Sequence, residues 1–368
     1  MDSHMTSMTF ARRSAADQTD AAARAPIDRK VDDKAMLRAA AELTRDLHAP
    51  NPAVYWVDFL TSAVVGYVAL AVATLWVSPW AILAGAVAAL ALYRAGSFIH
   101  EITHMKPSAV PGFRLGWNLL FGVPMMVPSF MYEGVHTIHH TRTRYGTVED
   151  PEYLPLALMK PWTLPLFVLT ALLAPVALVL RYAVVVPLSL VIPRLRTWLV
   201  ERASSLAINP AFRRRAPEGE LRTRWLWLEA ATSVWAIALV ALVAGGVIPL
   251  RAFAIFLGIY AVSTLLNQIR TLVAHLWEND GEAMSVTAQY LDSVNVPPPS
   301  YLPFLWAPVG LRYHALHHLV PSVPYHALGE AHRRLVAALG TESPYHDANH
   351  PGLAPLVARL VRSTTGGR

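Results

Sequence analysis

The stretch FLTSAVVGYVALAVATLWVSPWAILAGAVAALALYRAGS, residues 59–97, decides the fold of this chain. Its two apolar runs, residues 59–77 and 80–97, are separated only by Ser78 and Pro79. Each run has nearly the ~20 residues that an α-helix needs to cross about 30 Å of hydrocarbon. Because the connection is so short, the two runs are predicted to form an antiparallel transmembrane hairpin.

A second pair of apolar runs, residues 225–247 and 253–272, predicts a second hairpin of the same kind. The expected fold class is therefore all-α, a polytopic membrane protein with two transmembrane hairpins and about four spans. Residues 161–193 are apolar, but they are short for two full spans and are interrupted by prolines and by Arg181. We expect interfacial or re-entrant helices there, with two short tilted helices as the alternative, and a membrane-surface segment over residues 115–131.

The composition also indicates a membrane protein. Of the 368 residues, 54% are hydrophobic and 15% are charged, whereas an ordinary soluble domain has about 25% charged residues. The absence of cysteine excludes disulfides, thiolate-bound zinc, iron–sulfur clusters and a cysteine nucleophile. The net charge of +6 is expected to face anionic membrane lipids. No nucleic acid is expected as a partner, because no basic stripe with interleaved aromatic residues is present.

Basic residues predict the orientation of the hairpins. Eight Lys or Arg residues precede the first hairpin and eight Arg residues lie between positions 194 and 224, whereas the outer turns carry only Arg251. By the positive-inside rule, both termini and the middle segment are predicted to be cytoplasmic. We divide the chain into a cytoplasmic N-terminal segment (1–50), partly disordered with an amphipathic helix over 33–47, a membrane domain (51–335) and a cytoplasmic C-terminal tail (336–368).

Three histidine clusters accompany the hairpins: HEITH at 100–104, HTIHH at 136–140 and HALHH at 314–318. Residues three or four apart lie on one face of an α-helix, so each cluster presents several imidazoles together. An HxxxH pair alone is a weak signal, but two copies of HxxHH are not expected by chance among 15 histidines. His275 follows the last span and is predicted to lie at the same membrane depth.

These histidines predict a two-metal site in a cytoplasmic helical cap. Imidazole binds iron, zinc, copper and nickel, so the residue type alone does not select the metal. One tetrahedral zinc ion cannot use so many ligands, whereas two metal ions can. The candidate metal ligands are His100, His104, His136, His139, His140, His275, His314, His317 and His318. The other six histidines are expected to be structural or exposed.

In their order and placement, these motifs make the chain resemble the membrane fatty-acid desaturase superfamily, which includes lipid and alkyl hydroxylases. The flanking sequences YGTVEDPEY at 145–153, PVGLRY at 308–313 and LVPSVPY at 319–325 resemble those of bacterial acyl-lipid desaturases. The resemblance extends over residues 55–335. It implies two non-haem iron ions held by the nine histidines, with O2 as co-substrate.

The resemblance further implies O2-dependent desaturation of a lipid acyl chain in the inner membrane of a bacterium, with lipid or alkyl hydroxylation as the alternative. Electrons would come from an external donor of the ferredoxin or cytochrome type. By similarity to acyl-CoA desaturases, one iron would take His100, His136, His314 and His317, and the other His104, His139, His140, His275 and His318. Thr271 stands where those enzymes have an asparagine, which puts this partition in doubt.

The same resemblance places residues 107–131 and 270–280 along a substrate tunnel. Polar and aromatic residues near the second cluster and His275 are candidates for hydrogen bonds to the imidazoles. They are Glu149, Asp150, Trp277, Glu278, Asn279 and Asp280.

Two other functions stay open. HEITH fits the HExxH signature of zinc proteases, with Glu101 as general base, but this function uses only two of the nine histidines. A metal transporter would use histidines as carriers. Transport sites tend to lie near the bilayer midplane, however, whereas these clusters are predicted at the cytoplasmic ends of the spans.

Overall fold

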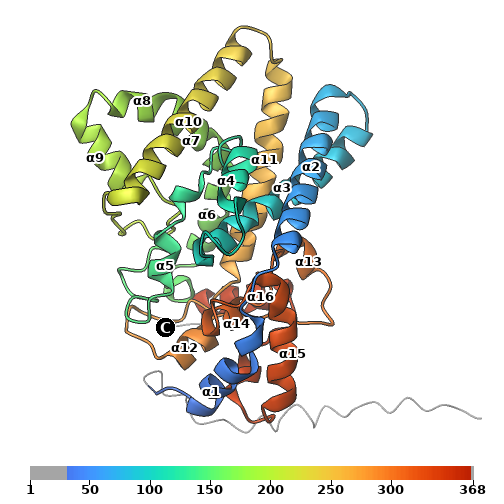
Figure 1. The fold of residues 1–368 in the computed structure, drawn as a ribbon, viewed down its shortest axis with the longest axis vertical. Helices are drawn as coiled ribbons and strands as arrows, with labels where there is room; N and C mark the ends of the chain where they lie inside the picture. Colours follow the sequence, from blue (N-terminus) through green and yellow to red (C-terminus); the bar gives the residue numbers. More distant parts are fainter. Residues whose placement is uncertain (1–30, 366–368) are drawn as a thin grey trace, which may run out of the picture.

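Two long helical hairpins form one end of the protein, as seen in the computed structural model, which describes residues 31–365 (Figure 1). The first consists of α2 (Pro52–Leu75) and α3 (Trp80–His104), the second of α10 (Gly219–Ala244) and α11 (Leu250–Leu272). All four helices are long and apolar enough to cross a membrane, so the predicted all-α, polytopic membrane fold is confirmed. α2 begins earlier than the apolar run because the Asn51 side chain accepts hydrogen bonds from its first backbone N–H groups.

Small residues allow close packing both within the first hairpin and between the two hairpins. A Cβ atom at Gly66 of α2 would lie 2.8 Å from the Leu92 side chain, so only glycine allows α3 to approach this closely. Ser263 of α11 donates a hydrogen bond to the Ala89 carbonyl of α3 at 3.0 Å. Large aliphatic and aromatic side chains remain exposed on the outer faces of the hairpins, as expected for surfaces that contact lipid.

The segment between the hairpins forms a helical run, Thr163–Ser189, that is a fifth candidate span by length and composition alone. As expected, its α-helical geometry is interrupted, by a 3-10 turn at Thr170–Leu173 and a π turn at Arg181–Val185. Each proline lies within the first three residues of a short α-helix. Backbone N–H groups there have no partner inside the helix. These short helices are α6 (Thr163–Leu169), α7 (Ala174–Leu180) and α8 (Val186–Ser189), followed by α9 (Pro193–Arg202).

Arg181, the charged residue of this run, is buried in the protein. Its Nε donates to the Ala203 carbonyl at 2.8 Å, and its guanidinium forms an ion pair with Glu229 of α10 at 3.3 Å. Glu229 also pairs with Arg196 of α9 at 2.6 Å. Because Ala203 follows α9 directly, these contacts hold α9 against the run that precedes it.

Residues 115–131 do not contain a helix long enough to span a membrane. They include part of α4 (Phe113–Trp117) and two short turns, η3 (Asn118–Gly122) and η4 (Ser129–Met131). Most of their large side chains, Met125, Met126 and Phe130 among them, are buried in the core. The segment therefore packs against the hairpins on one side, while Leu115, Leu119 and Leu120 remain exposed, as in a membrane-surface segment.

The other helices form a cap at one end of the hairpins (Figure 1). They are α1 (Lys34–Leu43), α5 (Val135–His139), α12 (Val286–Asp292), α13 (Pro303–Trp306), α14 (His314–Leu319), α15 (Leu328–Ala338) and α16 (Leu353–Thr365). Asp33 caps α1 by accepting the Met36 N–H at 2.8 Å. Met36 and Ala40 are buried in one cluster with Leu335 of α15, so the predicted amphipathic helix lies on the protein's own surface.

The chain after residue 336 is part of this cap. The Asn295 N–H donates to the Ala348 carbonyl, and the His350 N–H donates to the Asn295 carbonyl, each at 2.8 Å. α16 buries Leu356 and Leu360. The described part of the C-terminal segment is thus held by the same packing and hydrogen bonds as the rest of the cap.

Candidate metal centre

The first histidine cluster lies on the last turns of α3. The helix does not stop at residue 97, where the apolar run ends, but continues to His104. His100 and His104 are four residues apart and therefore share a face, with ring centroids 5.1 Å apart. The end of a long hairpin helix thus carries two imidazoles into the cap.

The other histidines come from short elements. α5 starts after Gly134, whose φ of 76° suits glycine, and carries His136 and His139, with His140 directly following. α14 carries all three histidines of the third cluster. His275 follows the C-terminal end of α11 and forms an isolated bridge with Ser293.

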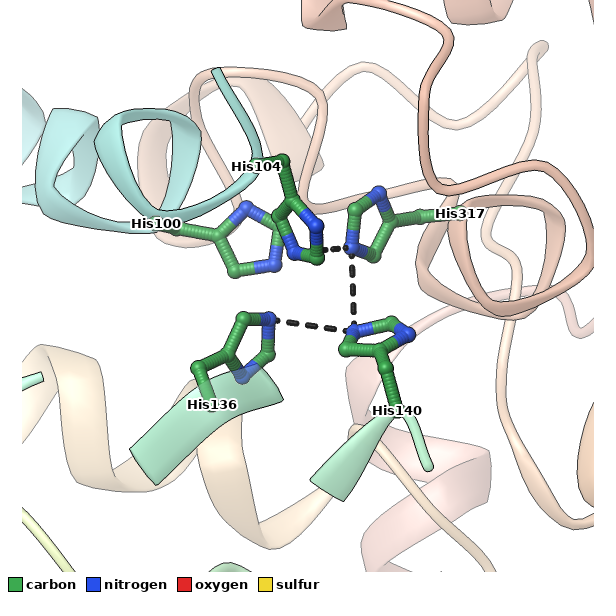
Figure 2. Close-up of side chains that lie close together, drawn as sticks. All are labelled: His100, His104, His136, His140 and His317. Atoms are coloured by element: carbon green, nitrogen blue, oxygen red, sulfur yellow. Dashed lines mark hydrogen bonds between the residues drawn. The ribbon is translucent and has the colours of Figure 1, made fainter. Parts of the chain in front are cut away.

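All nine predicted histidines converge, in two groups. The first group contains His100, His104, His136, His140 and His317 (Figure 2), and the second contains His139, His275, His314 and His318. Within each group, one ring nitrogen from every histidine lies within 4.8 Å of the others. In the first group, His317 Nε2 lies 3.0 Å from His104 Nε2 and 3.2 Å from His140 Nε2. In the second group, His314 Nε2 lies 3.0 Å from His275 Nε2 and 3.2 Å from His318 Nε2.

This grouping differs from the partition implied by similarity to acyl-CoA desaturases. That partition separated His136 from His140 and His314 from His318, whereas the structure keeps each of these pairs together. The reason is helical geometry, because residues four apart share a face and the intermediate histidine points about 100° away from its neighbour. His139 therefore turns to the second group, and His317 turns to the first.

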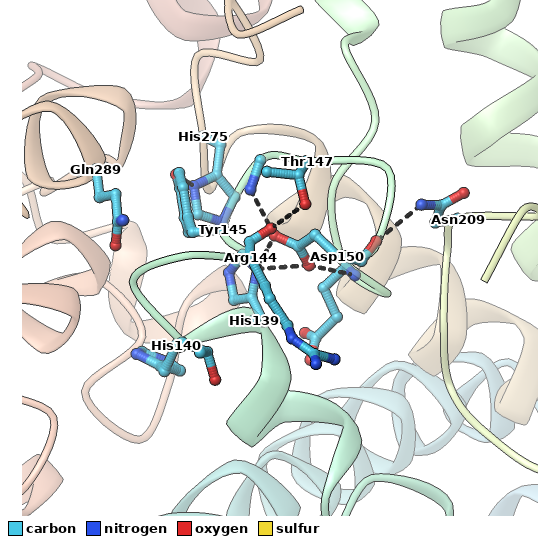
Figure 3. A network of polar contacts seen from close by, with 12 residues as sticks. His139, His140, Arg144, Tyr145, Thr147, Asp150, Asn209, His275 and Gln289 are labelled. Atoms are coloured by element: carbon cyan, nitrogen blue, oxygen red, sulfur yellow. Dashed lines mark hydrogen bonds and ion pairs between the residues drawn. The ribbon is translucent and has the colours of Figure 1, made fainter. Parts of the chain in front are cut away.

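Buried acceptors hold three of the rings in a fixed orientation. His136 Nδ1 lies 2.9 Å from Glu152 Oε1, and His139 Nδ1 lies 2.9 Å from Asp150 Oδ2. His275 Nδ1 lies 2.8 Å from the Tyr145 hydroxyl (Figure 3). A carboxylate can only accept, so Nδ1 of His136 and of His139 carries the proton and Nε2 presents its lone pair.

The expected hydrogen bond from Asp150 to a histidine is confirmed. Its neighbour Glu149 instead lies on the surface and pairs with Arg144 at 3.4 Å. The role of Glu152 was not expected from the sequence, although it lies only two residues beyond Asp150. Nor was that of Tyr145, whose hydroxyl donates to the Asp292 carboxylate at 2.9 Å.

The residues after His275 support the site differently from the prediction. Asn279 donates to the Gly146 carbonyl at 3.0 Å and so fastens the loop behind the second cluster. Trp277 is fully buried, and its ring contacts the His275 ring edge-on at 4.9 Å. Glu278 pairs with Arg359, and Asp280 is exposed.

The electrostatics keep most of these imidazoles neutral, which is the form that binds metal ions. Burial, followed by the neighbouring histidines, lowers the pKa of His136, His140, His275, His314, His317 and His318. Burial also lowers the pKa of His139, but the Asp150 carboxylate reverses this and the net shift is upward. Burial raises the pKa of Glu152 to about 7, so it accepts from His136 Nδ1 as a carboxylate above this pH.

The two groups fit metal ions. Where Nδ1 of a histidine donates its proton to a carboxylate, as in His136 and His139, Nε2 can only accept. The Nε2 atoms of neighbouring rings lie about 3 Å apart, close enough to converge on one cation. Both ring nitrogens of His100 are buried and have no hydrogen-bond partner, and a metal ion would supply a partner for one of them.

A cavity of about 510 Å³ leads from the histidines into the helical core. His100, His139, His275 and His314 line one end, and Leu92, Phe121, Met125, Leu178 and Tyr260 line the other. The predicted tunnel segments 107–131 and 270–280 both contribute to its wall. The cavity wall therefore combines apolar side chains with histidines of both groups.

The geometry does not support the zinc protease. Glu101, its required general base, accepts hydrogen bonds at Oε2 from the Tyr55 hydroxyl (2.5 Å) and from the Tyr325 N–H (3.1 Å). These contacts tie α3 to α2 and to the segment after α14. Glu101 therefore has a structural role, and seven histidines would remain unexplained.

Comparison with known proteins assigns the family. Residues 74–349 match the fatty acid desaturase family, which is about three quarters of the chain. The chain therefore belongs to the fatty acid desaturase family and is an integral membrane enzyme of the oxidoreductase type. Over 332 residues it is 50% identical to a ceramide hydroxylase of Caulobacter vibrioides (strain NA1000 / CB15N), and the match covers 90% of this chain and 94% of that protein. No solved structure matches the chain.

Proposed function

We propose that this protein hydroxylates a ceramide in the membrane. The similarity to the Caulobacter ceramide hydroxylase carries the proposal, because half of the residues are identical over nearly the full length of both chains. The sequence favoured desaturation, with hydroxylation as the alternative. The similarity supports that alternative, and desaturation becomes the second candidate.

The nine histidines would hold two iron ions. The group of His100, His104, His136, His140 and His317 would bind one ion, and the group of His139, His275, His314 and His318 the other. Iron bound there supplies the activation of O2 and the removal of hydrogen from an unactivated C–H bond. For hydroxylation, one oxygen atom enters the C–H bond. The other leaves as water, with two electrons and two protons from an external ferredoxin- or cytochrome-type donor.

The chain's own residues prepare the site and the substrate. Asp150 and Glu152 keep the proton of each bonded histidine on Nδ1, which leaves Nε2 free for the metal. The apolar end of the cavity holds the hydrocarbon chain and excludes water from it. The histidines at the other end of the cavity then lie next to one particular segment of the hydrocarbon chain.

The proposed location is the inner membrane of a bacterium, with the cap and both termini in the cytoplasm, where the electron donor is available. The charge distribution supports this orientation, since eight basic residues precede each hairpin in the sequence, whereas the turn between α10 and α11 carries only Arg251. The chain has no cysteine, so single cysteines introduced in the cap and in the turn near Gly246 can be labelled without background. Labelling of the cap cysteine by a membrane-impermeant reagent in intact cells would contradict the orientation.

Lipid mass spectrometry tests the reaction. Ceramides of a host that expresses the chain and a donor should gain the mass of one oxygen atom. The gain should be lost in His317→Ala and kept in His346→Ala, which removes a histidine outside both groups. Loss of two hydrogen atoms would identify a desaturase. An unchanged lipid pool with the donor present would overturn both candidates.

A further inference from the structure

Arg270 is a cation in the wall of the cavity, on the last turn of α11. It lies five residues before His275, at the end of the cavity that the histidines line. Tyr260, at the apolar end, is ten residues away on the same helix, or about 15 Å at 1.5 Å per residue. The guanidinium is therefore beside the metal centre and distant from the apolar end.

Other polar side chains of this wall are satisfied by the protein. Thr264 donates to the Ala171 carbonyl at 2.8 Å, Gln268 to the Phe167 carbonyl at 3.0 Å, and Thr271 to the Asn267 carbonyl at 2.9 Å. Each of these groups can therefore line an apolar chain without leaving a donor unpaired.

Arg270 differs from these neighbours. Within residues 31–365 no carboxylate lies at ion-pair distance from it, although Glu152 is near enough for electrostatic attraction, and its buried Nε has no hydrogen-bond partner. The neighbouring Tyr93 hydroxyl, which can accept from it, donates its own proton to the Trp306 carbonyl at 2.8 Å. The guanidinium has five N–H donors, so most of its hydrogen-bonding capacity is unused.

A half-buried guanidinium whose donors are mostly unpaired is costly, and electrostatic attraction to the nearby Glu152 does not supply the missing hydrogen bonds. An acceptor oxygen that enters the cavity would offset it. A methylene chain has no acceptor, so a substrate attacked at mid-chain would place hydrocarbon against Arg270. A ceramide attacked near its amide would place the carbonyl oxygen there.

We infer that Arg270 binds the acyl carbonyl oxygen of the substrate's amide and thereby sets the position of attack, within a few carbons of that carbonyl. The rest of the acyl chain extends toward Phe121, Met125 and Tyr260. Arg270 is on this basis a positioning residue, because it holds the substrate and does not act on the reacting carbon. This inference rests on the proposed function, since it takes an amide-linked acyl chain as the substrate.

Binding to the metal-free protein gives the first test. The probes are a ceramide and its thioamide analogue, in which sulfur, a weak acceptor, replaces the carbonyl oxygen. A hydrogen bond to a charged group changes affinity by about 10- to 100-fold, so wild type should prefer the ceramide by that factor. Arg270→Met should bind both probes equally, and Arg270→Lys should keep part of the preference. Arg251→Met, at the other end of α11, is the matched control and should behave as wild type.

The position of the product hydroxyl gives the second test. Fragmentation mass spectrometry should place it near the amide in wild type, and Arg270→Met should lower kcat/KM and spread the hydroxyl along the chain. Three results would overturn the inference. Wild type could bind both probes equally, it could bind a free fatty acid more tightly than ceramide, or the product could carry its hydroxyl at mid-chain. Preference for the ceramide without any ceramide product would overturn the proposed function and leave the Arg270 contact standing.

Discussion

Replacing Asp150 by asparagine is expected to weaken metal binding in one histidine group and spare the other. The Asp150 side chain is fully buried and accepts from His139 Nδ1 at 3.0 Å (Oδ1) and 2.9 Å (Oδ2). It also accepts the Gly146 N–H at Oδ2 and the Glu152 N–H at Oδ1, each at 2.8 Å. Asparagine has nearly the same shape but only one acceptor oxygen.

The magnitude follows from these contacts. In either orientation of the amide, one backbone N–H faces an NH2 group and loses its partner, which costs about 1–3 kcal/mol of stability. His139 loses the carboxylate that orients its ring. The loss of such a partner typically lowers metal affinity about 10- to 100-fold, or about 1.4–2.8 kcal/mol. Glu149→Gln is the matched control, because its exposed ion pair contributes within about 0.5 kcal/mol.

The assay is elemental analysis of the purified protein during exposure to a chelator. Wild type and Glu149→Gln should carry two iron ions, and Asp150→Asn should lose the ion of the His139 group first and retain about one. Two ions released from Asp150→Asn at the wild-type rate would refute the reasoning. Loss of both ions together would show that the two groups are not independent sites.

Three further predictions concern other parts of the fold. Glu229→Ala leaves two arginines without their counter-ion in the protein, so thermal unfolding in detergent should show a loss of about 3 kcal/mol; an unchanged melting temperature would contradict this. Glu101→Gln keeps an acceptor for both of its hydrogen bonds, so hydroxylation should fall less than about tenfold; complete loss would revive Glu101 as a general base. Gly96→Ala places a Cβ 2.9 Å from the Phe121 ring, which should shift into the cavity. When ceramides of different acyl length compete, the variant should then hydroxylate shorter chains in preference by about tenfold. An unchanged preference would mean that the acyl chain does not bind in this cavity.

The sequence by itself determined the hairpins and the nine histidines. A run of about 20 apolar residues has few alternatives to a membrane helix, because its backbone hydrogen bonds must be satisfied within the segment. Histidines at a spacing of three and four residues share a helix face by local geometry alone. Asp150 was also found from the sequence, because it lies in the loop directly after the second cluster.

Only the tertiary structure decided how the clusters combine. Local geometry keeps His136 with His140, but which helix they face depends on how α3, α5 and α14 meet in the cap. The helical run between the hairpins depends on the buried partners of Arg181, which lie far away in the sequence. Arg270 likewise shows nothing unusual in the sequence. Its missing partner is visible only once the folded chain surrounds it with a cavity, because burial is a property of contacts between distant segments.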